Sequence, residues 1–205
     1  MSLGRNISGL KGLLLGLLVL SVLLSSGCGT SQKTDFYQLY VEADHSLTNV
    51  ENGDVIGIGP INLPEYIKRP QIITRKSDHS LNMSEFNRWI EPFTDSITRV
   101  MVINLSNELS SNRVFWLPRR DRQYPLDLRV SVDIGRFDGA LGKEVTLETR
   151  WMVFDKNDNP LQTHISIIHE PVKGQTYEDL VIAMNNALTK LSLEIAQAAK
   201  KHIKK

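Results

Sequence analysis

The segment LDLRVSVDI, residues 126–134, is the strongest indication of the fold, because apolar and polar side chains alternate along its whole length. Successive side chains of a strand point to opposite faces of a sheet, so this alternation predicts a strand with one buried and one polar face. The same period of two returns at residues 145–153 and at residues 161–167. The turn-forming segment DKNDNP, residues 155–160, separates the last two stretches. The sequence therefore predicts an antiparallel meander with long hairpins.

Two long helices and several short strands complete the predicted domain. Apolar residues at intervals of three and four run through residues 91–109, with Asn104 as the polar exception. The second helix closes the chain, and Thr176 and Asp179 have capping-box spacing at its start. The predicted fold class is α/β: a mixed, largely antiparallel sheet with two long helices in one domain. The short strands are expected at residues 36–40, 55–58, 71–75, 81–86 and 114–117.

Three prolines punctuate the segment PINLPEYIKRP, residues 60–70. Each proline fixes φ and lacks a backbone N–H, so a helix interior or a central strand is disfavoured. We therefore expect the strand at residues 55–58 to stop at Gly59–Pro60 and a rigid loop to follow.

Composition excludes several classes of protein. The 205 residues carry 24 Lys+Arg against 23 Asp+Glu, which gives a formal net charge of +1. This balance argues against a nucleic-acid-binding protein, which would normally have a strongly basic face. The chain has one cysteine, which can form neither an internal disulfide nor a cysteine-rich zinc site.

The N-terminus has the pattern of a bacterial export signal. Arg5 and Lys11 precede a 12-residue uncharged run at residues 13–24, shorter than the roughly 20 apolar residues of a spanning helix. The following LSSGC, residues 24–28, resembles the lipobox of bacterial prolipoproteins, with Ser25 where that family usually has Leu. A cleaved secretory signal with an incidental cysteine and a short membrane anchor are the alternatives.

The lipobox resemblance implies that Cys28 receives a diacylglycerol, that cleavage precedes it, and that the new amine is acylated, for example by palmitate. The expected organisation is a signal peptide at residues 1–27, a lipidated tether at 28–34 and a domain at 35–205. Gly29 stands where an Asp would resemble an inner-membrane retention signal, which favours the outer membrane, facing the periplasm.

Candidate catalytic and metal sites fail on spacing. His164 and His169 are five apart on one strand, so they face opposite sides, roughly 17 Å apart, and cannot share a metal. Asp127 and Asp133 share a strand face but lie roughly 20 Å apart, too far for paired-carboxylate chemistry. The basic turn at residues 119–122 is a solvated loop or an anion site. We predict no catalytic residue, metal or cofactor, and hence no enzyme.

A series of motifs resembles one family along the whole mature chain. They are FYQL at residues 36–39, GPINLPEY at 59–66, RPQI at 69–72, RWIEPF at 88–93 and RFD at 136–138. Their order is similar to that of the ABC-type transport auxiliary lipoproteins, the PqiC-like family of Gram-negative bacteria.

This resemblance implies an outer-membrane lipoprotein in a PqiABC-like, MCE-type system for lipid transport and membrane integrity. The implied partner is a periplasm-spanning MCE-domain protein (PqiB-like), and a homo-oligomeric ring stays open. Alternatives are a periplasmic lipoprotein enzyme and a stand-alone lipid binder.

A rigid loop with aromatic and arginine anchors is typical of a binding surface. The same residues could instead be structural: Trp89 in the core, and Arg75 or Arg88 paired with Glu91. The lysines at residues 200–205 are helix-end charges or a lipid-headgroup contact. The candidate partner-binding residues are Tyr37, Pro60, Leu63, Pro64, Tyr66, Arg69, Pro70, Arg88 and Trp89.

Overall fold

The alternating stretches form the predicted meander, with strands β6 (Leu128–Gly139), β7 (Glu144–Asp155) and β8 (Pro160–Pro171). Both pairings are antiparallel and run almost the full length of each strand. The computed structural model describes residues 32–41, 53–117 and 125–203. Cys28, the basic turn at residues 119–122 and the last two lysines therefore lie outside the described residues.

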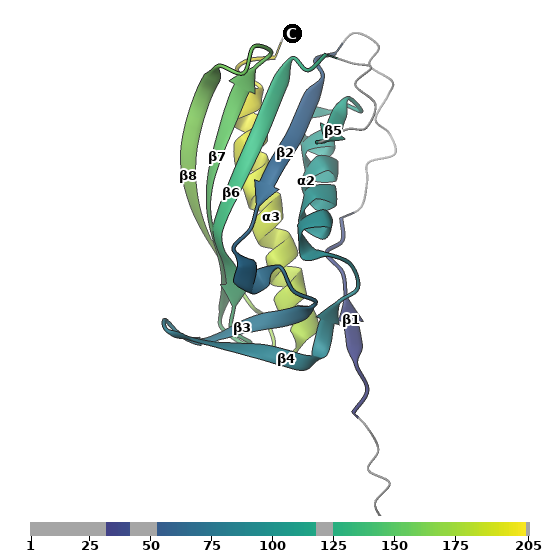
Figure 1. Ribbon diagram of the computed structural model, residues 1–205, viewed down its shortest axis with the longest axis vertical. Coiled ribbons are helices and arrows are strands. Elements are labelled where there is room, and N and C mark those ends of the chain that lie inside the picture. Colours follow the sequence, from purple (N-terminus) through teal and green to yellow (C-terminus); the bar gives the residue numbers. More distant parts are fainter. Residues whose placement is uncertain (1–31, 42–52, 118–124, 204–205) are drawn as a thin grey trace, which may run out of the picture. The chain divides into compact units, whose positions relative to one another are not determined.

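The remaining strands extend the sheet beyond β6. Strand β2 (Ile56–Asn62) lies parallel to β6 and to β5 (Val114–Trp116), and β3 (Gln71–Ser77) touches the end of β6 through Thr74 and Gly139. The predicted hairpin is confirmed: β3 pairs antiparallel with β4 (Ser80–Trp89), and β1 (Asp35–Tyr37) lies parallel to β4. The result is an eight-stranded mixed sheet (Figure 1).

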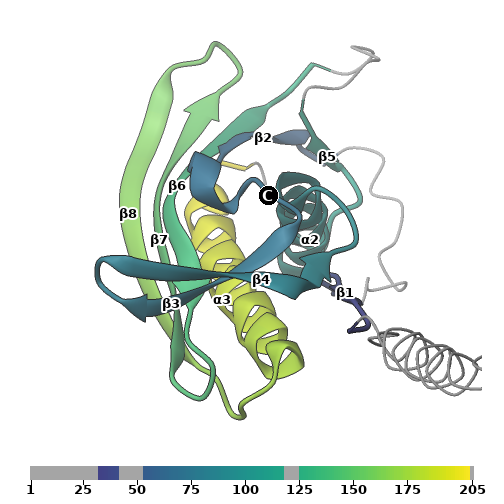
Figure 2. The same ribbon diagram turned by 60° about the horizontal axis from the view of Figure 1, so that its bottom comes forward.

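Both predicted helices are present, as α2 (Phe93–Leu109) and α3 (Tyr177–Ala199). The sheet curves around them, so the helices lie within its concave side (Figure 2). The capping box of α3 is confirmed: Asp179 N donates to Thr176 Oγ1 at 3.1 Å, and Thr176 N donates to Asp179 Oδ2 at 3.0 Å. Apolar side chains from both helices and from β6 and β7 fill the core, among them Met101, Leu188, Leu147 and Trp151. The predicted α/β fold class is confirmed.

The prediction that a strand stops at Gly59–Pro60 is wrong. Strand β2 continues through Pro60 to Asn62, and its first half is central, between β5 and β6. The pairing of β2 with β6 shifts register between Ile58 and Ile61, so Pro60 falls where the ladder needs no N–H from it. A short 3-10 helix, η1 (Glu65–Ile67), follows.

Strand β8 presents its alternating apolar residues to the outside. Ile165 and Ile167 are 58% and 62% exposed, whereas Ser166 and Ile168 face inward. The reason is the register with β7, which places Trp151 opposite His164 and Thr149 opposite Ser166 on the inner face. Among the described residues, no helix combines the length and apolar character needed to span a membrane.

Candidate partner-binding site at the proline-rich loop

Two apolar residues of the proline-rich segment anchor it in the core. Leu63 and Ile67 are buried, 6% and 3% exposed, so they anchor the segment in the core. Pro64 precedes the first residue of η1, where a fixed φ and a missing N–H cost nothing. Pro60, Arg69 and Pro70 are exposed. The segment thus has a buried side that fixes its path and an exposed side that faces solvent.

A fully buried carboxylate, Asp138 on β6, ties this segment to the sheet. Tyr66 Oη of η1 donates to Asp138 Oδ2 at 2.8 Å. Arg75 of β3 makes a bidentate contact, Nε to Oδ1 and Nη2 to Oδ2, both at 2.7 Å. Arg136 Nε adds a fourth hydrogen bond at 3.1 Å. One carboxylate therefore joins η1, the β3–β4 hairpin and β6.

The electrostatics of this cluster favour the ionised carboxylate. Burial raises the pKa of Asp138, but the hydrogen bonds from Arg75 and Tyr66 outweigh burial and hold this pKa below its usual range. Burial and the bond to Asp138 raise the pKa of Tyr66 to about 12. Because Arg75 pairs with Asp138, it is not a partner of Glu91. Glu91 instead pairs with Arg99 of α2.

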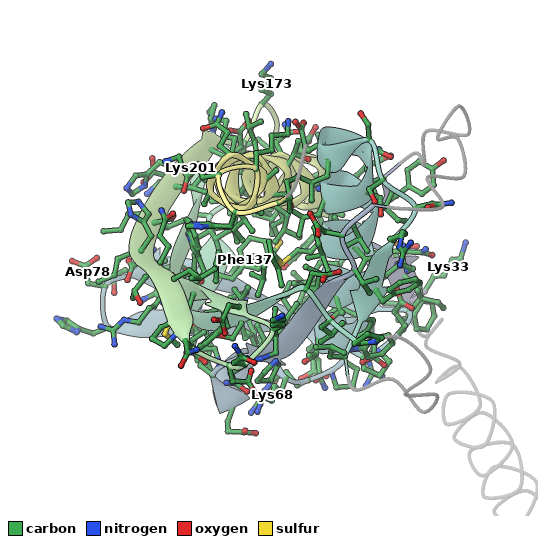
Figure 3. The ribbon with its side chains drawn as sticks, turned by 90° about the horizontal axis from the view of Figure 1, so that it is seen from above. Lys33, Lys68, Asp78, Phe137, Lys173 and Lys201 are labelled. Atoms are coloured by element: carbon green, nitrogen blue, oxygen red, sulfur yellow. The ribbon has the colours of Figure 1, made fainter. Side chains whose placement is uncertain are left out.

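Trp89 belongs to the core rather than to the surface. It is 6% exposed, and its ring stacks on Phe93 with centroids 4.4 Å apart. Phe93 stacks in turn on Phe137 at 5.6 Å, and Figure 3 shows Phe137 in the interior, with Lys68 and Asp78 at the periphery. Of the two interpretations left open for Trp89, the structure supports the core one.

A groove of about 380 Å³ opens between the end of the proline-rich segment and the start of α2. Trp89 and Phe93 contribute apolar surface, Ile90 is 57% exposed, and Lys68 and Arg69 supply positive charge. Glu91, which also lines the groove, accepts a hydrogen bond from Arg99, whose Nη2 also donates to Leu39 O at 3.1 Å. Burial raises the pKa of Glu91, but the bonds from Arg99 and Ser96 outweigh burial, so this pKa is lowered. The groove is lined by Lys68, Arg69, Pro70, Trp89, Ile90, Glu91, Pro92, Phe93 and Thr94.

The structure brings together only part of the predicted binding set. Arg69, Pro70 and Trp89 line the groove, whereas Leu63 is buried and Tyr66 is occupied by Asp138. Tyr37 lies on β1, where its Oη donates to Asn87 Oδ1 at 2.9 Å. Arg88 is half-buried on β4 and Pro60 is exposed on β2, both outside the groove. The partner-binding role of all nine residues stays a prediction.

Sequence reasoning missed Ile90 and Asp138. Ile90 lies within the RWIEPF motif, and nothing in its spacing marks it as exposed. Asp138 follows a register shift between Ile134 and Arg136. Before this shift the inward-facing apolar residues of β6 have even numbers, whereas after it Phe137, with an odd number, is buried. The sequence feature that could have indicated Asp138 is an aspartate within a strand that continues beyond a glycine, Gly135.

The side chains considered for catalysis and metal binding lie apart. His164 packs on Trp151, with ring centroids 5.3 Å apart, and His169 Nδ1 is 3.2 Å from Glu144 Oε1 on the other face. Asp127 Oδ2 accepts from Val55 N at 2.8 Å, and Asp133 Oδ1 accepts from Asn62 Nδ2 at 2.6 Å. These two carboxylates therefore have structural partners.

The core beneath the groove is filled. The void among Ile72, Trp89, Phe137 and their neighbours has a volume of about 10 Å³, room for a single water at most. A pocket for a lipid or drug-sized ligand is typically some 300–1,000 Å³. This void cannot hold an acyl chain.

Residues 37–196 match the family described as ABC-type transport auxiliary lipoprotein component. The chain belongs to this family. It is therefore an auxiliary lipoprotein of ABC-type transport, which confirms the family resemblance. The family's description as a transport accessory component supports a non-catalytic role.

Individual relatives agree with this family. The chain is 23% identical over 139 residues to the intermembrane transport lipoprotein PqiC of Escherichia coli (strain K12), covering 67% of this chain and 72% of that protein. The PqiC of Shigella flexneri gives the same values.

Two crystal structures share the fold. One is of an uncharacterized protein, with a TM-score of 0.68 and 17% identity over 82% of this chain and 99% of the other. The second is of a Xanthomonas campestris protein, with a TM-score of 0.64 and 16% identity over 80% and 93%.

Proposed function

We propose that this lipoprotein is the outer-membrane component of a PqiABC/MCE-like transport system, anchored through acylated Cys28 and facing the periplasm. It docks a periplasm-spanning MCE-domain protein and so supports lipid transport and membrane integrity. The observation that carries the proposal is the match of residues 37–196 to the transport auxiliary lipoproteins, together with the similarity to PqiC. The lipobox-like LSSGC ending at Cys28 supports the anchor.

The groove beside the proline-rich segment is the docking site in this proposal. The position of the groove is fixed by Leu63, Ile67 and the Asp138 cluster. Little conformational entropy of the groove would therefore be lost when a partner binds. An exposed isoleucine over a floor of stacked rings can bury apolar area, and Arg69 at the rim can select an acidic or carbonyl-rich segment.

Co-purification with the MCE protein encoded beside this lipoprotein tests the proposal. Ile90→Asp places a charge in the groove, and Arg69→Glu reverses the sign of the charge at its rim. Each variant should lower the amount of recovered MCE protein roughly tenfold, which corresponds to a loss of about 1.4 kcal/mol of binding free energy. Ile167→Asp is the matched control, because Ile167 is similarly exposed, 62% against 57%, but lies on β8.

The outcomes separate the two parts of the proposal. Wild-type lipoprotein that never co-purifies with the MCE protein would overturn the docking role. Equal recovery by Ile90→Asp, Arg69→Glu and Ile167→Asp would leave the docking role but remove the groove as its site.

A further inference from the structure

Exposed apolar side chains lie on β1 and β4, in the part of the sheet formed by β1, β4 and β3. The register places Phe36 opposite Arg88, and Ile73 opposite Met83, with Trp89 and Ile72 on the buried side. The patch consists of four exposed apolar side chains, Phe36 at 57%, Leu81 at 40%, Met83 at 43% and Phe86 at 37%. Large apolar side chains left exposed on two neighbouring strands are typical of a surface that is covered in the working protein.

This patch lies at one end of the domain. The β3–β4 hairpin crosses that end, with β1 beside it, whereas the C-terminal end of α3 lies at the opposite end (Figure 1). Turning the bottom forward presents the same hairpin in front of the helices (Figure 2). Lys200 and Lys201, which the sequence suggested as a headgroup contact, follow α3 and so are remote from the patch.

The covalent anchor selects what covers the patch. Strand β1 begins at Asp35, seven residues after Cys28. Seven residues span at most about 25 Å when fully extended. An acyl chain on Cys28 therefore keeps β1 and the face it shares within a short distance of the lipid surface at all times. This tether gives the patch a high effective concentration of lipid.

The chemistry of the face suits a membrane interface. Arg69 Nη1 lies 3.5 Å from Met83 Sδ, and Arg88 lies beside Phe36 in the register. Arginine stems cover apolar surface while the guanidinium reaches phosphate oxygens, and aromatic side chains enter the headgroup region. Asp35 and Glu85 are also exposed at this end, so apolar insertion rather than net charge provides the attraction.

We propose that the patch of Phe36, Leu81, Met83 and Phe86 lies in the headgroup region of the leaflet that holds the lipid anchor. This inference rests on the acylation of Cys28 in the proposed function. It orients the domain with the β3–β4 hairpin on the membrane and the C-terminal end of α3 toward the periplasm. The partner groove, whose lining residue Arg69 contacts Met83 of the patch, then opens next to the lipid surface.

A thiol-reactive, polarity-sensitive dye such as a nitrobenzoxadiazole tests this orientation on the full mature lipoprotein. Cys28 is the only cysteine, and acylation consumes its thiol, so the dye reports on one introduced cysteine. Met83→Cys and Phe86→Cys place the dye in the patch. Trp116→Cys is the control, because Trp116 is also an exposed aromatic, at 48%, and its strand β5 lies toward the other end.

Each labelled protein is reconstituted into vesicles of phosphatidylethanolamine and phosphatidylglycerol, with and without spin-labelled lipid. We expect a blue shift and quenching at positions 83 and 86 and neither at 116. Equal emission at all three positions overturns the proposal. A shift at 83 and 86 that requires the added MCE protein also overturns it, by assigning the patch to a protein partner. Labelling of the parent without an added cysteine would expose a free Cys28 and refute the acylation itself.

Discussion

At the scale of single residues, Asp138 is the group on which the site depends. It has no exposed surface, yet three side chains from different parts of the chain satisfy its carboxylate. A buried charge is tolerated only with such complete pairing, since an unpaired one costs several kcal/mol. The cluster thereby fixes η1 and the hairpin relative to β6.

Asp138→Asn tests this role. The amide has the same size but removes the charge and turns an N–H toward Arg75, so we expect a loss of about 3 kcal/mol in the free energy of unfolding, measured in urea. Asp158→Asn is the control: Asp158 also binds an arginine, Arg129, at 2.8 Å, but its side chain is 74% exposed. Exposed pairs contribute about 0–1 kcal/mol, so a similar loss in both variants would contradict the role given to Asp138.

The same carboxylate predicts a dependence on pH. Because the pKa of Asp138 is lowered on folding, its contribution is present above the unfolded pKa, about 4, and is lost as pH falls through the folded value. The stability difference between wild type and Asp138→Asn should therefore be constant near neutrality and shrink below about pH 4. Urea unfolding at stepped pH measures this difference. A gap that widens on acidification would show the opposite sign.

At the scale of elements, β2 is the strand whose path forms the site. Gly59 has a φ of +136°, and a Cβ built there would lie 2.9 Å from Leu117 O. Glycine is therefore required where β2 passes β5 and turns into the proline-rich segment. The register shift at Pro60 then redirects the chain toward η1.

Gly59→Ala should destabilise the protein by about 2 kcal/mol, because alanine rarely adopts this φ and its methyl group meets backbone rather than a movable side chain. Gly135→Ala is the matched control, since the nearest atom to its Cβ is Glu148 O at an ordinary 3.8 Å. Thermal unfolding compares the two variants. Equal melting temperatures would mean that β2 accommodates a side chain at Gly59.

At the scale of the whole molecule, one end of the domain carries the start of β1, the apolar patch and the groove. In the proposed arrangement, a tether and an apolar face on the same end act together, because the tether would remove most of the entropy cost of membrane contact. The concave side of the sheet is filled by α2 and α3, so the described surface rather than the interior is available to partners.

Replacing residues 1–28 with a cleavable secretory signal that lacks the cysteine should move the protein from the membrane to the soluble periplasmic fraction. One acyl chain gives marginal membrane binding and two or more give stable anchoring, so the patch alone should not retain the domain. Fractionation of cells checks this outcome, and the intact mass of the wild type should include its acyl chains. Retention of the exchanged protein in the membrane would contradict this dominance of the anchor.

Local patterns in the sequence were sufficient to predict the two helices and the three long strands. The period of two predicted β6 to β8, and the three-and-four spacing with the Thr176–Asp179 box predicted α2 and α3. Such patterns follow from hydrogen bonds and side-chain directions within a few residues, so no distant partner is needed to read them.

The site, in contrast, depends on contacts between residues that are distant in the chain. Tyr66 and Arg75 lie 72 and 63 residues from Asp138 in the chain, and no local pattern pairs them. The shift at Gly135 changes which face Phe137 occupies, and the shift at Pro60 lets β2 continue through a proline beyond its central first half. The physical reason is that side-chain parity is set by pairing with a neighbouring strand, so it is fixed only when the sheet is assembled.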